Sequence, residues 1–279
     1  MSKRKRLLIL VSSVLLMAVL TGCGKTGSID ASSTGFWDHY IVWNFSRAIT
    51  GLSNLFFGSY GLGIISFTIL IRIILLPLMH HQMKSTRKMS DMQPRLKALQ
   101  KQYASKDTET QNKLREETQK LYSEAGVNPA MGCLPMLVQM PVLMALYQAI
   151  SRTEVLKAGH FLWMNLGERD PYFILPVLAA VLTFATTKLS TMSQAESNSM
   201  TSAMLYTMPA LILFMGVTLP SALSLYWVVG NAFSVGQTLL LNNPFKIKKE
   251  RDEKVQAERD RQKALEKAIK PKKKKNKKK

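Results

Sequence analysis

Five apolar segments, each close to the length needed to cross a lipid bilayer, constrain the fold of this chain more than any other feature. A helical span needs about 20 apolar residues, because backbone N–H and C=O groups in hydrocarbon must be satisfied within the segment itself. The chain is 47% hydrophobic yet carries a formal net charge of +20, which fits charges placed between apolar blocks. We therefore predict an all-α polytopic membrane protein with five transmembrane helices, at residues 60–79, 134–150, 173–187, 203–219 and 221–241.

The first 22 residues have the layout of a bacterial lipoprotein signal peptide. Four basic residues at 3–6 precede an apolar stretch at 7–20, and the sequence LTGC then ends at Cys23. These four letters resemble a lipobox, in which a diacylglyceryl group is attached to the cysteine sulfur before cleavage. A retained first transmembrane helix is the alternative, but the apolar stretch is short for a span.

Residues 23–57 are expected to form an extracytoplasmic tether followed by an amphipathic helix. Residues 24–35 are rich in Gly, Ser and Thr, which is typical of a flexible linker. From Phe36 to Phe57 apolar residues recur at helical spacing, whereas polar residues occupy other positions around the helix. This pattern favours a helix lying in the outer membrane interface. A short soluble helix with a packed apolar face is the alternative.

The charge of the segments between the spans predicts the orientation. Residues 84–133 hold ten Lys/Arg against six Asp/Glu, and residues 246–279 hold seventeen against six. Residues 24–57 and 151–172 each balance to zero. Basic segments stay in the cytoplasm, and an odd number of spans then places the N-terminus outside, as a lipobox requires. We expect a multi-pass protein of the bacterial cell membrane with a lipid-anchored N-terminus outside and a cytoplasmic C-terminus.

The core, residues 58–245, is expected to include a cytoplasmic helical hairpin at residues 84–127. Apolar residues follow helical spacing from Met89 to Tyr103, and a second, weaker stripe includes Leu114 and Leu121. The basic tail, residues 246–279, ends in a lysine run that predicts disorder. Its charge suits anionic partners, either lipid headgroups or nucleic acid.

Arg72 is the sharpest candidate for a functional residue. It is the one charged residue within the five predicted spans, apart from Lys188 at the end of the third. It precedes His80 by eight residues, which places it roughly 12 Å from the cytoplasmic end of its helix. No Asp or Glu in any predicted span can pair with it. Arg72 either lines a wet, positively charged cavity or extends its side chain to the inner headgroups.

Polar residues on other spans could complete such a cavity. The fifth span carries one polar face, and Thr68 lies one helical turn before Arg72. Ordinary hydrogen bonding between helices is the alternative for each of these groups. The predicted substrate-groove residues are Arg72, Thr68, Gln139, Ser224, Trp227 and Asn231, and Ser234 and Thr238 continue the polar face of the fifth span.

The sequence carries no pattern typical of an enzyme. It has no Gly-rich phosphate loop, no H-E-x-x-H motif and no nucleophile elbow. His80 and His81 are adjacent and do not share a helix face, so they do not favour a metal site. We expect neither catalytic residues nor a cofactor.

Two runs of sequence, QPRLKALQKQY at 93–103 and LYSEAGVNPAMGCLPMLVQMPVLMALYQAI at 121–150, resemble the YidC/Oxa/Alb membrane insertases. The segment Leu225-Tyr226-Trp227 in the fifth span is similar too, and the resemblance extends over about residues 60–245. The lipobox and the short outer segment look like the Gram-positive branch of the family. The large extracytoplasmic domain of the Gram-negative branch is absent.

This resemblance implies a five-span core with a positively charged groove that is open to the cytoplasm and to lipid. Arg72 matches the groove arginine of the family. The implied function is the insertion and folding of nascent membrane proteins, either alone or beside the Sec translocon. The ribosome and anionic lipids are the other expected partners, and the chain is expected to work as a monomer. A small-solute transporter or channel is the alternative, although paired acidic residues and repeated halves are not evident.

The lipobox generates a direct prediction. Cells grown with labelled palmitate should incorporate label into the wild-type chain, because the lipobox directs an acyl anchor to Cys23. The Cys23→Ala chain should remain unlabelled, whereas Cys133→Ser, the control at the other cysteine, should label normally. Equal labelling of wild type and Cys23→Ala would rule out the anchor.

Overall fold

The computed structural model describes residues 27–269, apart from residue 133 and residues 195–198. The predicted signal peptide, Cys23 and the lysine-rich end at 270–279 lie outside the described residues. In chain order the elements are η1 (Phe36–Val42, a π-helix), α2 (Trp43–Leu55), α3 (Tyr60–Asp91), α4 (Gln93–Gln102), α5 (Thr108–Glu124), η2 (Pro129–Gly132), α6 (Leu134–Arg152), α7 (Glu154–Lys157), β1 (His160–Phe161), β2 (Met164–Asn165), α8 (Ile174–Met192), α9 (Ser199–Thr218), α10 (Ser221–Leu241) and α11 (Pro244–Ile269).

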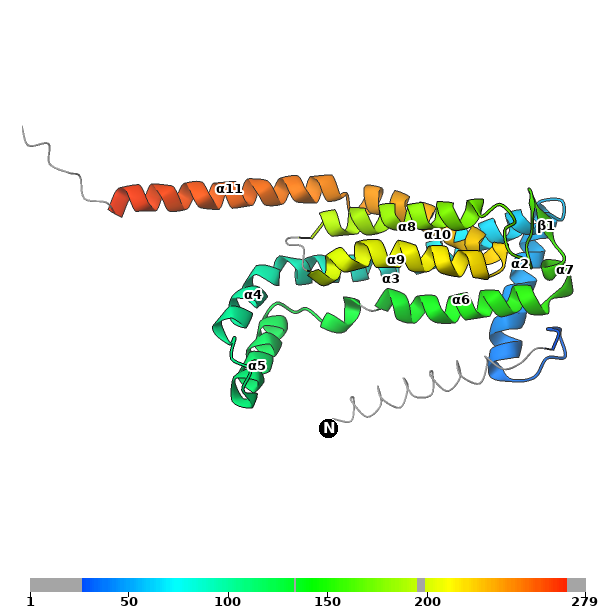
Figure 1. The fold of residues 1–279 in the computed structure, drawn as a ribbon, viewed down its shortest axis with the longest axis horizontal. Helices are drawn as coiled ribbons and strands as arrows, with labels where there is room; N and C mark the ends of the chain where they lie inside the picture. The colour runs from blue at the N-terminus through cyan, green and yellow to red at the C-terminus, as the bar shows by residue number, and fades with distance from the viewer. Residues whose placement is uncertain (1–26, 133, 195–198, 270–279) are drawn as a thin grey trace, which may run out of the picture.

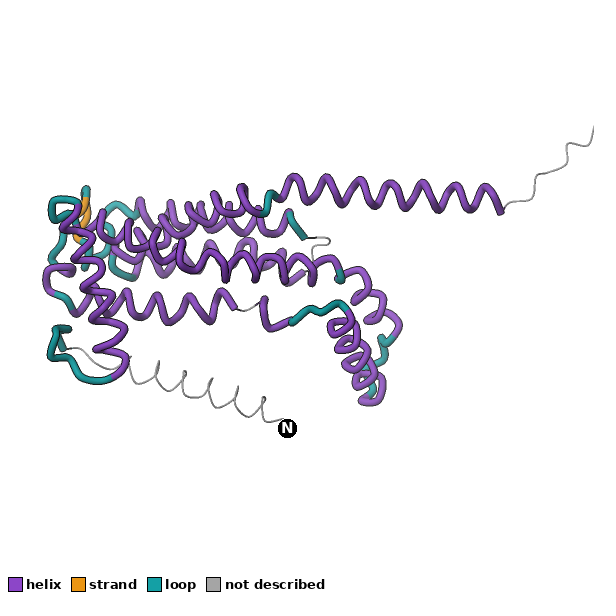
Figure 2. The backbone as a smooth tube through the Cα atoms, turned by 180° about the vertical axis from the view of Figure 1, so that it is seen from behind, coloured by secondary structure: helices purple, strands orange, loops and turns teal. Residues whose placement is uncertain are grey.

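Five long helices, α3, α6, α8, α9 and α10, run side by side as a bundle (Figure 1). At one end α2 crosses the bundle, and the short antiparallel hairpin β1–β2 lies at the same end. We call this the outer end. The helical pair α4–α5 and most of α11 extend beyond the opposite, inner end, as the view from behind also shows (Figure 2).

Helix length and composition confirm the predicted class, an all-α polytopic membrane protein. Among the described residues, α3, α6, α8 and Thr201–Thr218 of α9 are long and apolar enough to cross a membrane. Helix α10 is not among these four, because its polar positions lower its mean hydropathy. It has 21 residues, roughly 30 Å of helix, and lies within the bundle, so its role as a fifth span stays a prediction.

The packed core lies near the outer end, where α2 covers the bundle. Ile49 of α2, Ile64 of α3, Leu146 of α6 and Leu223 of α10 are all buried in one apolar cluster. Helices α2 and α3 approach closely because residue 63 is glycine: a Cβ there would lie 2.0 Å from the Ser53 hydroxyl oxygen. Large apolar side chains on the outside of the bundle stay exposed, as expected for surface that faces lipid. They include Ile73, Leu137, Val181 and Phe214.

Helix α3 continues beyond the predicted end of the first span at residue 79. It runs without interruption to Asp91, so the first part of the hairpin expected at residues 84–127 belongs to α3. The break comes just before α4, where Pro94 occupies the first turn of the new helix, a position that needs no backbone N–H. The remaining hairpin consists of α4 and α5.

A side-chain cap begins α5. The Asp107 carboxylate accepts hydrogen bonds from the Ser105 hydroxyl and from the backbone N–H of Thr110, the latter at 2.8 Å. Both bonds favour the ionised carboxylate and hold the pKa of Asp107 well below its ordinary value. The turn between α4 and α5 therefore keeps its cap throughout the physiological pH range.

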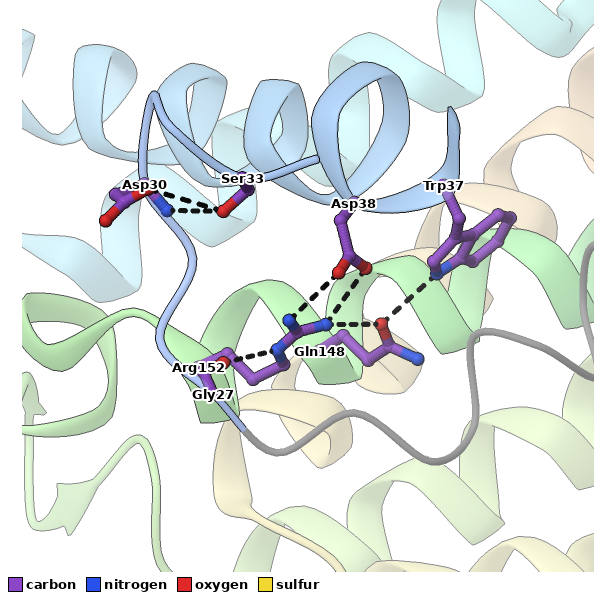
Figure 3. Close-up of polar contacts among 7 residues, drawn as sticks. All are labelled: Gly27, Asp30, Ser33, Trp37, Asp38, Gln148 and Arg152. Atoms are coloured by element: carbon purple, nitrogen blue, oxygen red, sulfur yellow. Dashed lines mark hydrogen bonds and ion pairs between the residues drawn. The ribbon is translucent and has the colours of Figure 1, made fainter. Parts of the chain in front are cut away.

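A buried ion pair joins the outer segment to α6 (Figure 3). The Arg152 guanidinium donates from Nη1 and Nη2 to the two oxygens of the Asp38 carboxylate, both at 3.1 Å. The two side chains are only 7% and 6% exposed. Arg152 Nε also donates to the Gly27 carbonyl at 2.7 Å, and Nη1 donates to the Gln148 side-chain oxygen at 3.2 Å.

Neighbouring bonds extend this polar cluster. The Trp37 indole N–H donates to the Gln148 side-chain oxygen at 3.2 Å, and the backbone N–H of Ile29 donates to the Arg152 carbonyl at 3.0 Å. We call Asp38, Gln148 and Arg152, with Trp37, the outer clamp. The clamp holds the chain at residues 27–38 against the outer end of α6. From the sequence, Asp38 was expected on the polar side of the helix at 36–57 and Arg152 in a segment of zero net charge, and no pair between them was predicted.

The outer clamp predicts a large effect of removing one charge. Arg152→Ala should lower the free energy of unfolding by about 3–5 kcal/mol, because it removes a buried cation that donates two hydrogen bonds to the Asp38 carboxylate. Lys113→Ala is the matched control, since it breaks the exposed pair between Lys113 and Glu109 and should cost less than about 1 kcal/mol. Unfolding would be followed by titration with a denaturing detergent in mixed micelles. Equal costs for the two variants would contradict the stabilising role of the clamp.

Candidate functional site

Arg72 lies part-way along α3 and faces α10. Its side chain is half-buried, and Nη1 donates to the Ser234 hydroxyl oxygen at 3.2 Å. The Ser234 hydroxyl in turn donates to the Gly230 carbonyl at 2.9 Å, which leaves its lone pairs free to accept from the guanidinium. Within the described residues Arg72 has no carboxylate partner. The result is an unneutralised positive charge in the middle of an apolar bundle.

A glycine allows this arrangement. A Cβ placed on Gly230 would lie 2.6 Å from Arg72 Nη2 and 3.4 Å from both Cζ and Nε. The guanidinium therefore lies directly against the backbone of α10, a distance that only glycine permits. Gly230 was not among the predicted site residues, although an isolated glycine in an apolar helix often marks a place where another group lies close to the backbone.

Gln139 contacts a residue that sequence analysis did not assign to the groove. Its side-chain amide on α6 donates to the Tyr226 hydroxyl of α10 at 2.9 Å. Tyr226 itself is buried in the core cluster. The pair ties α6 to α10 through a polar bond inside the bundle.

The other predicted groove residues form bonds within or between helices. The Thr68 hydroxyl donates to the Ile64 carbonyl at 2.7 Å, and Ser224 donates to the Gly216 carbonyl at 3.4 Å; both side chains are fully buried. Asn231 donates to the Thr183 hydroxyl of α8 at 3.0 Å. Trp227 belongs to the core cluster. The structure thus brings Arg72 and Ser234 into direct contact, while these four residues stabilise helix packing around them, and their groove role stays a prediction.

A polar cavity of about 80 Å³ lies at the inner ends of α3, α8 and α10. Along α3 it begins at Gln82, ten residues from Arg72, or roughly 15 Å along the helix. Thr238, the last member of the predicted polar face, also lines it. The full lining is Gln82, Met83, Thr86, Arg87, Ser90, Ser190, Ser193, Gln194, Thr238 and Asn242.

Helix α11 is attached beside this cavity by two ion pairs. Arg87 of α3 contacts Glu250 at 3.2 Å, and Arg251 contacts Asp91 of α3 at 2.7 Å. Arg251 also donates to the Ser193 carbonyl at 3.1 Å, at the end of α8. Each helix supplies one cation and one anion to these two pairs. The alternation holds α11 in one register against the inner end of the bundle. These pairs are more exposed than the outer clamp and are screened by salt.

The described residues were also compared with the ligand sets that metal ions need. Among them, no group of three His, Cys, Asp or Glu side chains is placed to hold a metal ion. The chemistry available at Arg72 is electrostatic attraction and hydrogen-bond donation from its guanidinium.

Comparison with known proteins assigns this arrangement to a family. Residues 52–250 match the family described as the 60Kd inner membrane protein. The membrane protein insertase YidC of Enterococcus faecalis is 60% identical over 274 residues, covering 98% of both chains. The chain belongs to the YidC insertase family. YidC 1 of Listeria monocytogenes and YidC of Pediococcus pentosaceus are each 56% identical, over 90% and 91% of both chains respectively.

A solved YidC structure shares the fold. It is described as an active YidC insertase with the first transmembrane domain resolved, and it superposes with a TM-score of 0.58 at 31% sequence identity. The match covers 74% of this chain and 47% of that chain, so about half of the solved YidC has a counterpart here.

The contact between Arg72 and Gly230 predicts a specific thermodynamic coupling. Gly236→Ala, on the same helix with open space at its Cβ, should raise the free energy of unfolding by up to about 1 kcal/mol through helix propensity. Gly230→Ala should not show this gain in the wild type, because the methyl group displaces the guanidinium. In an Arg72→Ala background Gly230→Ala should regain it, giving a coupling of about 0.5–3 kcal/mol. Additive effects of the two substitutions would show that the guanidinium does not lie on Gly230.

Proposed function

We propose that this chain is a membrane protein insertase that guides nascent proteins into the plasma membrane through a hydrophilic, positively charged groove. The observation that carries the proposal is Arg72, which is half-buried in an apolar helix bundle and contacts the Ser234 hydroxyl rather than a carboxylate. Holding a charge in this setting is costly, so such residues are typical of pathways for polar or charged substrates. The high identity to proteins named YidC insertases supports the same function.

The proposed mechanism is physical rather than covalent. A short hydrophilic outer segment of the client, often acidic, is attracted to Arg72 and enters the groove. The adjoining apolar helix of the client then moves along the exposed apolar surface of the bundle and partitions into lipid. Hydrophobic transfer of that helix drives insertion, so the step consumes no nucleotide. The comparisons do not favour the alternative of a small-solute transporter or channel.

The two ends of the bundle support one direction for this movement. The outer end carries the packed core and the buried outer clamp. The inner end carries a polar cavity and the exposed ion pairs of α11. We infer that clients enter from the inner, cytoplasmic end, that α10 is the fifth span, and that the lipid-anchored N-terminus lies outside.

We infer further partners from charge. The basic tail that begins with α11 suits ribosomal RNA or anionic lipid, and the ion pairs to Arg87 and Asp91 would hold its first part near the cavity. The hairpin α4–α5 would receive or guide the nascent chain. The Sec translocon is a further expected partner, and the chain is expected to work as a monomer.

Replacing Arg72 tests the proposal. In proteoliposomes, Arg72→Ala should reduce insertion of a client with an acidic outer segment about tenfold or more, since one charge-assisted contact contributes about 1.5–3 kcal/mol. Arg72→Lys should retain much of the activity, because it keeps the charge. Lys188→Ala, which removes an exposed charge at the inner end of α8, is the matched control and should insert normally.

The choice of client separates charge from folding. A client whose outer segment lacks acidic residues should be less affected by Arg72→Ala. The amount of folded protein, measured in parallel, should not fall, because the substitution removes an unpaired charge from the bilayer. Full insertion of acidic clients by Arg72→Ala would show that the charge serves no attraction, as expected if the side chain only extends to the headgroups.

A further inference from the structure

Three large apolar residues adopt a backbone conformation that such residues rarely have. Among the described residues, Phe57, Leu162 and Phe173 are the non-glycine positions with positive φ, at 53°, 53° and 56°. The left-handed region is disfavoured by contacts of Cβ and is usually occupied by Gly, Asn or Asp. Each of the three positions therefore carries backbone strain, which persists only where the surrounding structure imposes it.

The same three side chains are exposed. The exposed fractions are 106% for Phe57, 73% for Leu162 and 48% for Phe173. In water an exposed phenylalanine or leucine side chain adds nothing to the stability of the fold. Asparagine or glycine at the same position would also relieve the backbone strain. Strain and exposure together indicate that these side chains are directed outward to meet an apolar environment. We call the three residues the outer rim.

All three residues lie at the outer end of the apolar helices. Phe57 lies in the loop between α2 and α3, and Phe173 immediately precedes α8. Leu162 lies in the turn between β1 and β2. The hairpin itself lies at the outer end of the bundle (Figure 1). This hairpin lies against the first turn of α3, because a Cβ on Gly61 would be 2.0 Å from the ring of Phe161.

The outer rim continues the apolar outer surface of the bundle. Beyond Phe173, the exposed face of α8 begins with Ile174 and Val177, which are 47% and 52% exposed. Next to the rim, Trp163 and Tyr172 are also exposed in part. Tryptophan and tyrosine favour the boundary between hydrocarbon and headgroups, because one side of each ring system is apolar and the other can hydrogen-bond.

One buried carboxylate fixes two members of the rim. Asp170 is 1% exposed and accepts a hydrogen bond from the Trp163 indole N–H at 2.9 Å, in the hairpin turn beside Leu162. It also accepts from the backbone N–H groups of Leu175 at 2.8 Å and Tyr172 at 3.1 Å, at the start of α8 beside Phe173. Asp170 thus ties the turn of the hairpin to the first turn of a predicted span.

We propose that the outer rim is a lipid-docking surface: Phe57, Leu162 and Phe173 insert into the outer leaflet at the boundary of the acyl chains. Asp170 is the positioning residue that sets the direction of Leu162 and Phe173. The occupant is lipid because the rim is continuous with the exposed apolar face of α8. The docking fixes the depth at which the outer end of the bundle lies, independently of whether any client is bound.

Depth-dependent quenching tests this proposal on the full chain in liposomes of phosphatidylglycerol and phosphatidylcholine. A Cys133→Ser chain would carry an environment-sensitive fluorophore at Leu162→Cys or Phe57→Cys, and the same chain without an added cysteine would be the blank for any label at Cys23. Glu168→Cys is the matched control, a naturally charged and exposed position six residues from Leu162.

Labels at 162 and 57 should emit at shorter wavelength than the label at 168. They should also be quenched at least twofold more by lipids with a spin label high on the acyl chain than by aqueous iodide. The label at 168 should show the opposite preference. Equal quenching of 162 and 168 by iodide would overturn the proposal. Protection of 162 from both quenchers would also overturn it, since protein and not lipid would then cover the rim.

A second variant tests the positioning role. Asp170→Asn should shift the label at 162 toward iodide and leave the label at 57 unchanged, because Asp170 contacts the hairpin turn and α8 but not the loop of Phe57. A loss of folded protein alone would move both labels equally, which would overturn the assignment of Asp170. Insertion activity is a separate readout, so failure of the insertase proposal would leave these quenching results interpretable.

Discussion

Hydrocarbon offers no hydrogen-bond partners, so polar groups inside the bundle must find their partners within the protein. The long helices satisfy their own backbone, and hydroxyls in the apolar region return to helix carbonyls. Thr68 donates to Ile64, and Thr183 donates to Ala179, each at 2.7 Å. Arg72 is the exception, because a guanidinium carries more donors than one helix can accept. Its contacts to Ser234 and the backbone at Gly230 show how α10 accommodates it.

Charged side chains are paired differently at the two ends of the bundle. At the outer end, the Asp38–Arg152 pair is bidentate and buried, and Asp170 is fully enclosed by donors. At the inner end, the pairs that hold α11 are partly exposed and border a polar cavity. The buried pairs of the outer end are therefore shielded from salt, whereas the exposed pairs of the inner end are screened by it.

Sequence patterns identified the charge inside the bundle but not the contacts that it makes. Arg72 could be selected because any arginine within an apolar span is unusual. Ser234 was placed on the polar face of the fifth span, but its contact with Arg72 could not be predicted, since the two residues are 162 positions apart in the chain. Gly230 was not selected, because it has no side chain that a polar pattern could include. The same holds for the outer clamp, because Asp38 and Arg152 are separated by 114 residues and lie in two segments that each have zero net charge.

The sequence by itself determined the membrane class, the approximate positions of the apolar helices and the resemblance to the family. Apolar length and hydrophobic periodicity are local properties of the sequence. Helices α6 and α10 accordingly begin at the predicted residues 134 and 221. Tertiary structure decided which polar residues face one another. Thr68 lies one turn before Arg72 on α3, and Ser224 lies on the predicted polar face of α10, yet packing turns both hydroxyls to helix carbonyls and leaves the guanidinium against Gly230. Helix periodicity specifies a direction around one axis, whereas a contact requires the distance and rotation of a second helix, which only the packed bundle sets.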